Sequence, residues 1–331
     1  YLNVEVTNKC ALECAHCSSS SSYNCTDYID PVRLCSLISE GKKLGTKCLS
    51  ISGGDPLLYP YLTEIIDHAY NLGFHIRLYT SGIWSSNGTT LIPADNRLLS
   101  RFLHKVNAII FSLHSHVAAV HDQITTKQGS FNLTTAAISN AVNAGLNCEV
   151  HTVPMTINYK DISGLVKLGE ELRVSRISFL RLVPQGRCIY NLHLMMNYIQ
   201  VREFVNVLKN LDSPLLDIRK GAPYKCLFFE NAGDCSAGID KILVSPDGSV
   251  HPCEAFKFST SESNINNNPL EDIWLNDPLL NKIRSADVDS ISTCCECEMN
   301  DVCHGGCPGQ RYLAYDTMER GPDPLCLILN S

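Results

Sequence analysis

Residues 2–17 read LNVEVTNKCALECAHC, a strand-like apolar stretch that runs directly into three cysteines. Cys10, Cys14 and Cys17 therefore lie on one short loop, where a single inorganic centre can collect all three thiolates. A structural zinc or a closed iron–sulfur centre usually takes four protein ligands, whereas a catalytic centre keeps one position open for a small molecule. The stretch predicts a strand that ends in a metal-binding loop with an open position.

Downstream of this loop, apolar strand-like runs alternate with helical patterns up to about residue 210. The strand candidates are residues 2–7, 48–52, 75–80, 108–113, 148–153 and 177–182. The helix candidates are residues 31–44, 61–72, 96–104, 131–144, 159–172 and 195–211. This alternation predicts βαβ units and a parallel sheet. We therefore expect an α/β fold, a partial (β/α)6 TIM-like barrel over residues 1–210, with active-site loops after the strand ends.

The remaining part of the chain, residues 211–331, has a different character. Its hydrophobic periodicity fades, while Cys, Pro, Asn and Gly become more frequent. Such a composition is typical of an irregular domain that is held together by metal rather than by a broad apolar core.

Composition and charge exclude several classes of function. Hydrophobic residues make up 44% of the chain, the net charge is −7, and Lys and Arg form no run, which disfavours a nucleic-acid partner. No apolar stretch of membrane-spanning length and no signal peptide are visible, so we expect no membrane association and a cytoplasmic location. The 17 cysteines leave a disulfide framework as an alternative, but such frameworks belong to short secreted chains.

A glycine-rich turn, Ser52-Gly53-Gly54-Asp55-Pro56, follows the second strand candidate. Together with the Cys-x3-Cys-x2-Cys loop in a βα-repeat chain, it resembles the radical S-adenosylmethionine (radical SAM) superfamily and its Gly-Gly-Glu-Pro motif. The resemblance implies that the three thiolates hold a 4Fe-4S cluster whose fourth iron binds SAM, and that the turn contacts the SAM ammonium group. An ordinary strand-to-helix turn is the alternative for this motif.

Weaker resemblances place other SAM contacts at the ends of later strands. They assign Thr80 and Ser81 to the end of the third strand and Ser112 to the fourth. Thr125 stands where the family often has an Arg for the SAM carboxylate, and Lys127, Arg181 or Arg187 are its candidate replacements. Leu182 is a candidate for packing on the adenine, with core packing as its alternative.

A second cysteine array lies near the C-terminus and resembles the SPASM domain of radical SAM enzymes that modify peptides and proteins. It runs Cys235, Cys253, Cys294, Cys297, Cys303, Cys307 and Cys326. The resemblance implies two auxiliary 4Fe-4S clusters, and so three clusters in all. The ligands implied for the first auxiliary cluster are Cys226, Cys235, Cys253 and Cys307. Those implied for the second are Cys294, Cys297, Cys303 and Cys326. A zinc-stapled binding module is the alternative.

The resemblance implies a radical SAM oxidoreductase that abstracts hydrogen through a 5′-deoxyadenosyl radical and oxidatively modifies a peptide or protein side chain. Glu254 is the candidate base, because related sulfatase-maturing enzymes carry an acidic residue next to this cysteine, and a solvated surface carboxylate is its alternative. An external donor such as flavodoxin or ferredoxin would supply electrons. The alternatives are a radical step in small-molecule or cofactor biosynthesis and a non-enzymatic electron carrier with several clusters.

Overall fold

The computed structural model describes residues 1–220, 224, 227, 235–259, 263–286, 291 and 293–328. A sheet of nine strands runs through this part of the chain in the order β11-β10-β1-β2-β3-β6-β7-β8-β9. All neighbours pair in parallel except β10 and β11. The strands are β1 (Leu2–Glu5), β2 (Cys48–Ser52), β3 (His75–Thr80), β6 (Ala108–Ser112), β7 (Cys148–Thr152), β8 (Arg176–Phe179), β9 (Asp217–Arg219), β10 (Ile242–Val244) and β11 (Val250–His251).

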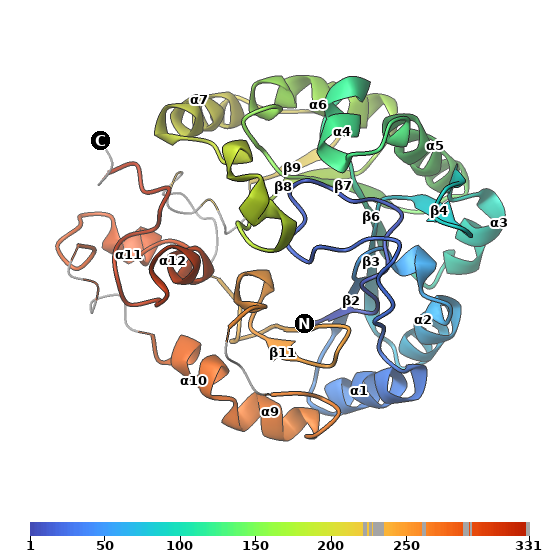
Figure 1. Ribbon diagram of the computed structural model, residues 1–331, viewed down its shortest axis with the longest axis horizontal. Helices are drawn as coiled ribbons and strands as arrows, with labels where there is room; N and C mark the ends of the chain where they lie inside the picture. The colour runs from blue at the N-terminus through green and yellow to red at the C-terminus, as the bar shows by residue number, and fades with distance from the viewer. Residues whose placement is uncertain are drawn as a thin grey trace.

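Helices cover the outer side of the sheet and leave its inner side toward the centre of the molecule (Figure 1). They are α1 (Pro31–Lys43), α2 (Leu62–Asn71), α3 (Asn96–Leu99), α4 (Ala118–Thr125), α5 (Ser130–Asn143), α6 (Ile162–Glu171) and α7 (Tyr198–Lys209). This arrangement confirms the expected α/β partial barrel. None of the helices in the described part of the chain has the length and apolar character needed to span a bilayer.

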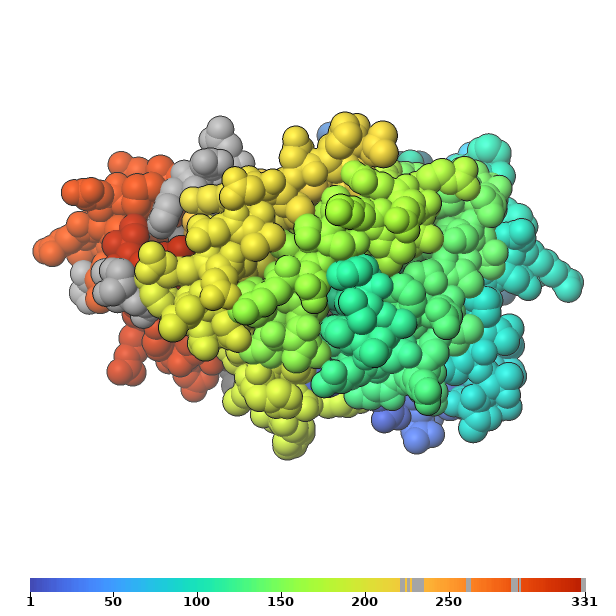
Figure 2. All heavy atoms as spheres, turned by 90° about the horizontal axis from the view of Figure 1, so that it is seen from above, coloured from blue at the N-terminus to red at the C-terminus, as the bar shows by residue number. Residues whose placement is uncertain are grey.

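The C-terminal part of the chain closes the open side of the barrel. Its helices are α9 (Leu270–Asn276), α10 (Pro278–Arg284), α11 (Asn300–Cys303) and α12 (Pro308–Tyr315). Seen from above, these orange and red residues occupy one end of an elongated molecule, opposite the cyan segment near residues 80–110 (Figure 2). Strands β9 and β10 join the barrel sheet, so the sheet extends beyond residue 210, where the sequence placed the end of the barrel.

Two features within residues 1–210 were not predicted from the sequence. The hairpin of β4 (Ile83–Ser85) and β5 (Leu91–Pro93) follows β3, and α4 precedes α5. Strands of three residues carry too little alternation to be read from sequence, and α4 covers only two turns.

Along β1, β2, β3 and β7, residues alternate between an apolar and a mostly polar side of the sheet. Val4 on β1 and Val150 on β7 belong to the core that packs beneath the helices. Glu5 and Glu149 are their neighbours in sequence, and because successive side chains point to opposite faces, they lie on the inner side of the barrel. The interior of the barrel therefore contains several polar and charged side chains.

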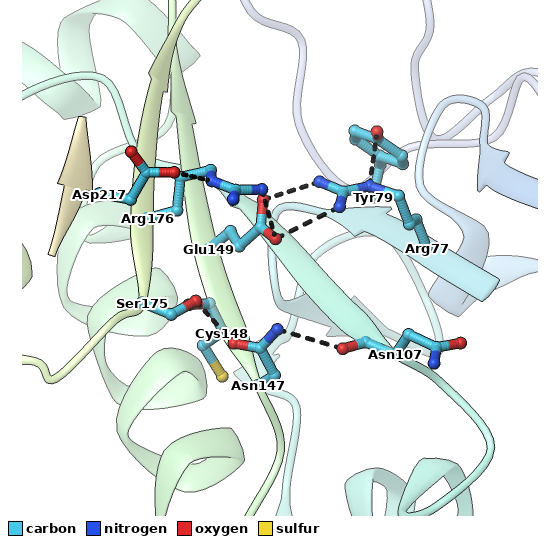
Figure 3. Close-up of polar contacts among 9 residues, drawn as sticks. All are labelled: Arg77, Tyr79, Asn107, Asn147, Cys148, Glu149, Ser175, Arg176 and Asp217. Atoms are coloured by element: carbon cyan, nitrogen blue, oxygen red, sulfur yellow. Dashed lines mark hydrogen bonds and ion pairs between the residues drawn. The ribbon is translucent and has the colours of Figure 1, made fainter. Parts of the chain in front are cut away.

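Figure 3 shows how charges on this inner side are paired. The buried Glu149 carboxylate accepts from Arg77 Nη2 at 2.7 Å and lies 3.5 Å from Arg176 Nη1. Arg176 Nε also donates to Asp217 on β9 at 2.6 Å. These ion pairs connect β3, β7, β8 and β9 across the interior, where an unpaired buried charge would be strongly unfavourable.

Candidate metal centres and active site

The first cysteine loop directly follows β1, and its three thiols lie near one another. Cys10 is buried beside Leu12 and Ile83, while Cys14 and Cys17 are half-buried. Burial raises the pKa of Cys10 well above its usual value and that of Cys14 to about 12, and in each case a neighbouring thiolate on the loop raises it further. Burial keeps these thiols protonated, and thiols release their protons when they bind a metal. This donor set therefore suits a metal centre.

The segment that follows β8 contacts the cysteine loop. This supporting role was not predicted from the sequence. The short helix η4 (Gly186–Tyr190) follows β8. The backbone N–H of Arg187 donates to the Cys17 carbonyl at 2.9 Å, and its guanidinium donates to the carbonyls of Cys14 at 3.0 Å and Ser21 at 2.8 Å. Arg187 therefore shapes the loop, and its contact with SAM stays a prediction.

The two glycines of the Gly-Gly-Asp-Pro turn let it approach the segment that leads into the cysteine loop. Gly54 N donates to the Thr7 carbonyl at 2.6 Å, and Asp55 N donates to the Lys9 carbonyl at 2.8 Å. A Cβ on Gly53 would lie 2.4 Å from the Thr7 oxygen, and one on Gly54 would lie 2.4 Å from the Lys9 oxygen. Only glycine therefore fits at either position. Contact of this turn with SAM stays a prediction.

Asp55 fixes the same turn to the end of β3. Its fully buried carboxylate accepts from Thr80 Oγ1 at 2.7 Å, from Ser81 N at 2.9 Å and from Ser81 Oγ at 2.5 Å. Pro56 begins the short helix η1 (Pro56–Leu58), and Leu57 N also donates to Asp55. The structure thus brings together three of the residues that the sequence assigned to SAM, Asp55, Thr80 and Ser81, and it shows them hydrogen-bonded to one another.

Three further candidates lie on or near the loops after β6. Ser112 is half-buried at the end of β6, in register with His151 on β7. Thr125, at the position of the expected Arg, is buried and shares a hydrogen bond of 2.6 Å with Ser130 Oγ. Lys127 is half-buried in the turn between α4 and α5.

Arg181 and Leu182 follow β8 and meet the C-terminal part of the chain. Both terminal nitrogens of Arg181 donate to the Asp323 carboxylate, at 2.7 and 2.6 Å, and both side chains are buried. Asp323 also accepts from the backbone N–H of Cys307, so the ion pair connects the barrel with the second cysteine array. Leu182 packs against the apolar cluster that contains Ile124 and Met155, and contact of either residue with SAM stays a prediction.

The described cysteines of the second array fall into two groups. Cys253 lies near Cys235 and Cys307, whose thiolates raise its pKa beyond the effect of burial. Cys226, the fourth ligand implied for this group, lies outside the described residues. The other group lines a single cavity, and its cysteines are Cys294, Cys297, Cys303 and Cys326.

Glu254 reaches from the second array to the first cysteine loop. Its Oε2 accepts from Ser18 Oγ at 3.3 Å and from Lys257 Nζ at 2.7 Å. Lys257 is nearly buried and also donates to Glu5 on β1 at 2.5 Å and to Ser19 at 2.7 Å. The sequence reasoning missed Glu5 and Lys257, although a glutamate within the apolar run LNVEV is the kind of signal that marks an inward-facing polar residue.

The donor sets fit iron–sulfur clusters in chemistry, because cysteine thiolates are the usual ligands of such clusters. The described cysteines are all free thiols. In the described part of the chain, no three His, Cys, Asp or Glu side chains are grouped closely enough for a single metal ion. A cubane cluster binds each thiolate through a different iron, so its ligands lie farther apart than those of one ion.

Comparison with family models matches most of the chain. The model for the radical SAM superfamily matches residues 4–169, and that for the SPASM iron–sulfur cluster-binding domain matches residues 235–298. The antilisterial bacteriocin subtilosin biosynthesis protein AlbA of Bacillus subtilis is 26% identical over 92% of this chain, which spans 66% of that protein. The AdoMet-dependent heme synthase of Methanosarcina barkeri is 26% identical over 98% of this chain and 95% of its own.

Solved structures with the same fold cover almost the whole chain. Streptococcus suis SuiB bound to S-adenosylmethionine superposes with a TM-score of 0.77 at 19% identity, over 98% of this chain and 76% of SuiB. Native anSMEcpe with bound AdoMet gives a TM-score of 0.72 at 17% identity, over 99% of this chain and 94% of its own. At these identities the likeness is one of fold.

Proposed function

Because the chain belongs to the radical SAM superfamily and carries a SPASM iron–sulfur domain, we propose that it oxidatively modifies a side chain of a peptide or protein. The observation that carries the proposal is the contact of Glu254, beside the second cysteine array, with Ser18 on the first cysteine loop. It brings a candidate base to the place where the radical arises.

The proposal assigns the cysteines to three 4Fe-4S clusters. Cys10, Cys14 and Cys17 hold the first, which leaves one iron for SAM, and the two C-terminal groups hold two auxiliary clusters with Cys226 as a ligand of one of them. When bound, these groups supply a 5′-deoxyadenosyl radical for hydrogen abstraction and a sink for the electron released by oxidation. A cytoplasmic flavodoxin or ferredoxin supplies the reducing electron.

The chain's own residues position the substrate and handle its proton. The interior of the barrel, where Glu149 pairs with Arg77 and Arg176, gives a polar substrate polar surroundings. Glu254 accepts the substrate proton, and Lys257 orients its carboxylate by an ion pair of 2.7 Å. The C-terminal part covers the open side of the barrel and excludes water from the radical.

Two kinds of substrate have support among the relatives. A peptide is supported by relatives named as PqqA peptide cyclase and by structures of SuiB with its precursor peptide SuiA and of anSMEcpe with the Cp18Cys peptide. A step in cofactor biosynthesis is the second candidate, because heme synthases match 97–98% of this chain.

A substrate test on the reconstituted enzyme distinguishes these candidates. We expect a short peptide encoded beside this gene to lose the mass of two hydrogen atoms when SAM and dithionite are present. Glu254→Gln should still form 5′-deoxyadenosine but should lower the yield of modified peptide at least tenfold, because the amide cannot take up the proton.

The matched control is Glu271→Gln, which changes an exposed carboxylate in the first turn of α9. It should keep the yield of the wild type. A modified peptide formed at full yield by Glu254→Gln would remove this residue from the mechanism, and consumption of a heme precursor in place of the peptide would support the second candidate.

A further inference from the structure

A groove of about 410 Å³ lies outside the contacts described so far. It is bounded by the η1 turn after β2, by the β4–β5 hairpin and by the segment of α3 and η2 (Ser100–Phe102), which are neighbours at one edge of the barrel (Figure 1). Its walls contain the aromatic rings of Tyr23, Tyr59 and Trp84. The groove is therefore an open surface with a mixed aromatic and polar lining.

The charges of this groove are all of one sign. Lys9 and Arg101 line it, and none of its lining residues is Asp or Glu. Lys9 Nζ stands 4.4 Å from the centroid of the Tyr23 ring, and Arg101 is exposed. In a chain with a net charge of −7, such a surface attracts an acidic partner.

The back wall of the groove adjoins the first cysteine loop. Lys9 immediately precedes Cys10. Leu58, which lines the groove, packs against the apolar cluster of Cys10, Ala11, Leu12 and Ile83. A partner seated here thus lies against residues that pack on the apolar cluster of Cys10.

We propose that this groove is the docking surface for the reductant, an acidic protein that carries a flavin able to give up one electron at a time. The inference rests on the proposed function, since only an enzyme that reduces its first cluster needs such a donor. One electron would leave the reduced flavin and be gained by the cluster that Cys10, Cys14 and Cys17 would hold, and no covalent bond would form or break. Lys9 and Arg101 orient the acidic rim of the donor toward this loop.

Binding of oxidised flavodoxin to the reconstituted enzyme tests the surface without turnover. We expect Arg101→Glu to weaken the affinity, measured by calorimetric titration at low salt, about tenfold or more. Arg97→Glu is the matched control, because it reverses an exposed charge on α3 but lies outside the groove lining. It should change the affinity less than twofold. No measurable binding by the wild type, or equal losses in both variants, would overturn the proposal.

Kinetics with two reductants separate docking from catalysis. With flavodoxin hydroquinone, Arg101→Glu should form 5′-deoxyadenosine at least fivefold more slowly than the wild type, whereas with dithionite, which needs no docking surface, the rates should agree. If Arg101→Glu also forms 5′-deoxyadenosine more slowly than the wild type when dithionite is the reductant, the proposal is overturned, because the groove would then serve the substrate. If the wild type forms no 5′-deoxyadenosine with dithionite, the proposed function fails, and the titration still decides whether an acidic flavoprotein docks here.

Discussion

Lys257 connects three parts of the candidate site, namely β1, the cysteine loop and Glu254. Its side chain is 6% exposed, and its ammonium group is shared between Glu5 on β1 and Glu254 beside Cys253. Burial raises the pKa of Glu5 to about 7. The Lys257 ammonium opposes this rise but does not cancel it, since this one buried cation serves two carboxylates. Glu5 and Lys257 are 252 residues apart in sequence, so no local pattern could have predicted their contact.

The environment of Glu5 predicts that the stability of the folded protein changes with pH. Because the pKa of Glu5 in the folded protein lies above its ordinary value of 4.5, the folded state binds this proton more tightly than the unfolded chain does. The contribution is therefore present at low pH and is lost as the pH rises toward 7. Between pH 5.5 and 8 we expect the wild type to lose roughly 1–3 kcal/mol of stability relative to Glu5→Gln.

Thermal unfolding of the reconstituted wild type and of Glu5→Gln at both pH values measures this difference. The groups that face Glu5 are Lys257, Glu254 and Ser19, and all remain in the variant. A gap in melting temperature that is the same at pH 5.5 and pH 8 would show that Glu5 does not titrate in this range.

At the scale of elements, the loop after β8 supports the cysteine loop. Gly186 begins η4 with a φ of 59°, and a Cβ at this position would lie 2.2 Å from the Ser18 carbonyl oxygen. The close approach allows Arg187 to bond the carbonyls of Cys14 and Cys17. The cysteine loop thus depends on an element that follows it by about 170 residues.

We predict that Gly186→Ala loosens this contact and impairs loading of the first cluster. The added methyl group cannot be accommodated without moving the backbone of residues 17–18. Iron content after anaerobic reconstitution should fall by about one cluster, or roughly four irons per chain. Gly45→Ala is the control, because Gly45 also has a positive φ, of 83°, but nothing lies within 4 Å of its Cβ position. Equal iron content in the two variants would contradict the supporting role of η4.

The sequence predicted the main strands and helices well, for a physical reason. Strands that are covered by helices read as short apolar runs, and β2 and β3 have the predicted bounds 48–52 and 75–80. The β4–β5 hairpin escaped prediction because its tip, residues 86–90, is polar and reads as a loop. Strand β10 escaped because its three apolar residues pair with β1, about 240 residues away.

At the scale of the whole molecule, three of the contacts that fasten the C-terminal part to the barrel involve β1 or a buried ion pair. These are the parallel pairing of β10 with β1, the buried ion pair of Arg181 with Asp323, and the contact of Lys257 with Glu5. Each of them ends close to a cysteine group. These contacts hold the barrel and the two C-terminal groups of cysteines in one arrangement.

The grouping of the cysteines shows what sequence reasoning could and could not reach. Cys10, Cys14 and Cys17 are adjacent in sequence, and spacing alone placed them together. In the second array, Cys253 and Cys307 belong to one group although Cys294, Cys297 and Cys303 lie between them, so only the family resemblance could separate the groups. The ligand assignment itself stays a prediction.

Formation of 5′-deoxyadenosine by the anaerobically reconstituted enzyme, with SAM and dithionite, tests the central claim most directly. We predict that the wild type, with about 12 irons per chain, forms 5′-deoxyadenosine and methionine. The variant with Cys10, Cys14 and Cys17 all replaced by Ala should form none while it keeps about eight irons. A fully loaded wild type that forms no 5′-deoxyadenosine, or a triple variant as active as the wild type, would contradict the assignment of this loop as the origin of the radical.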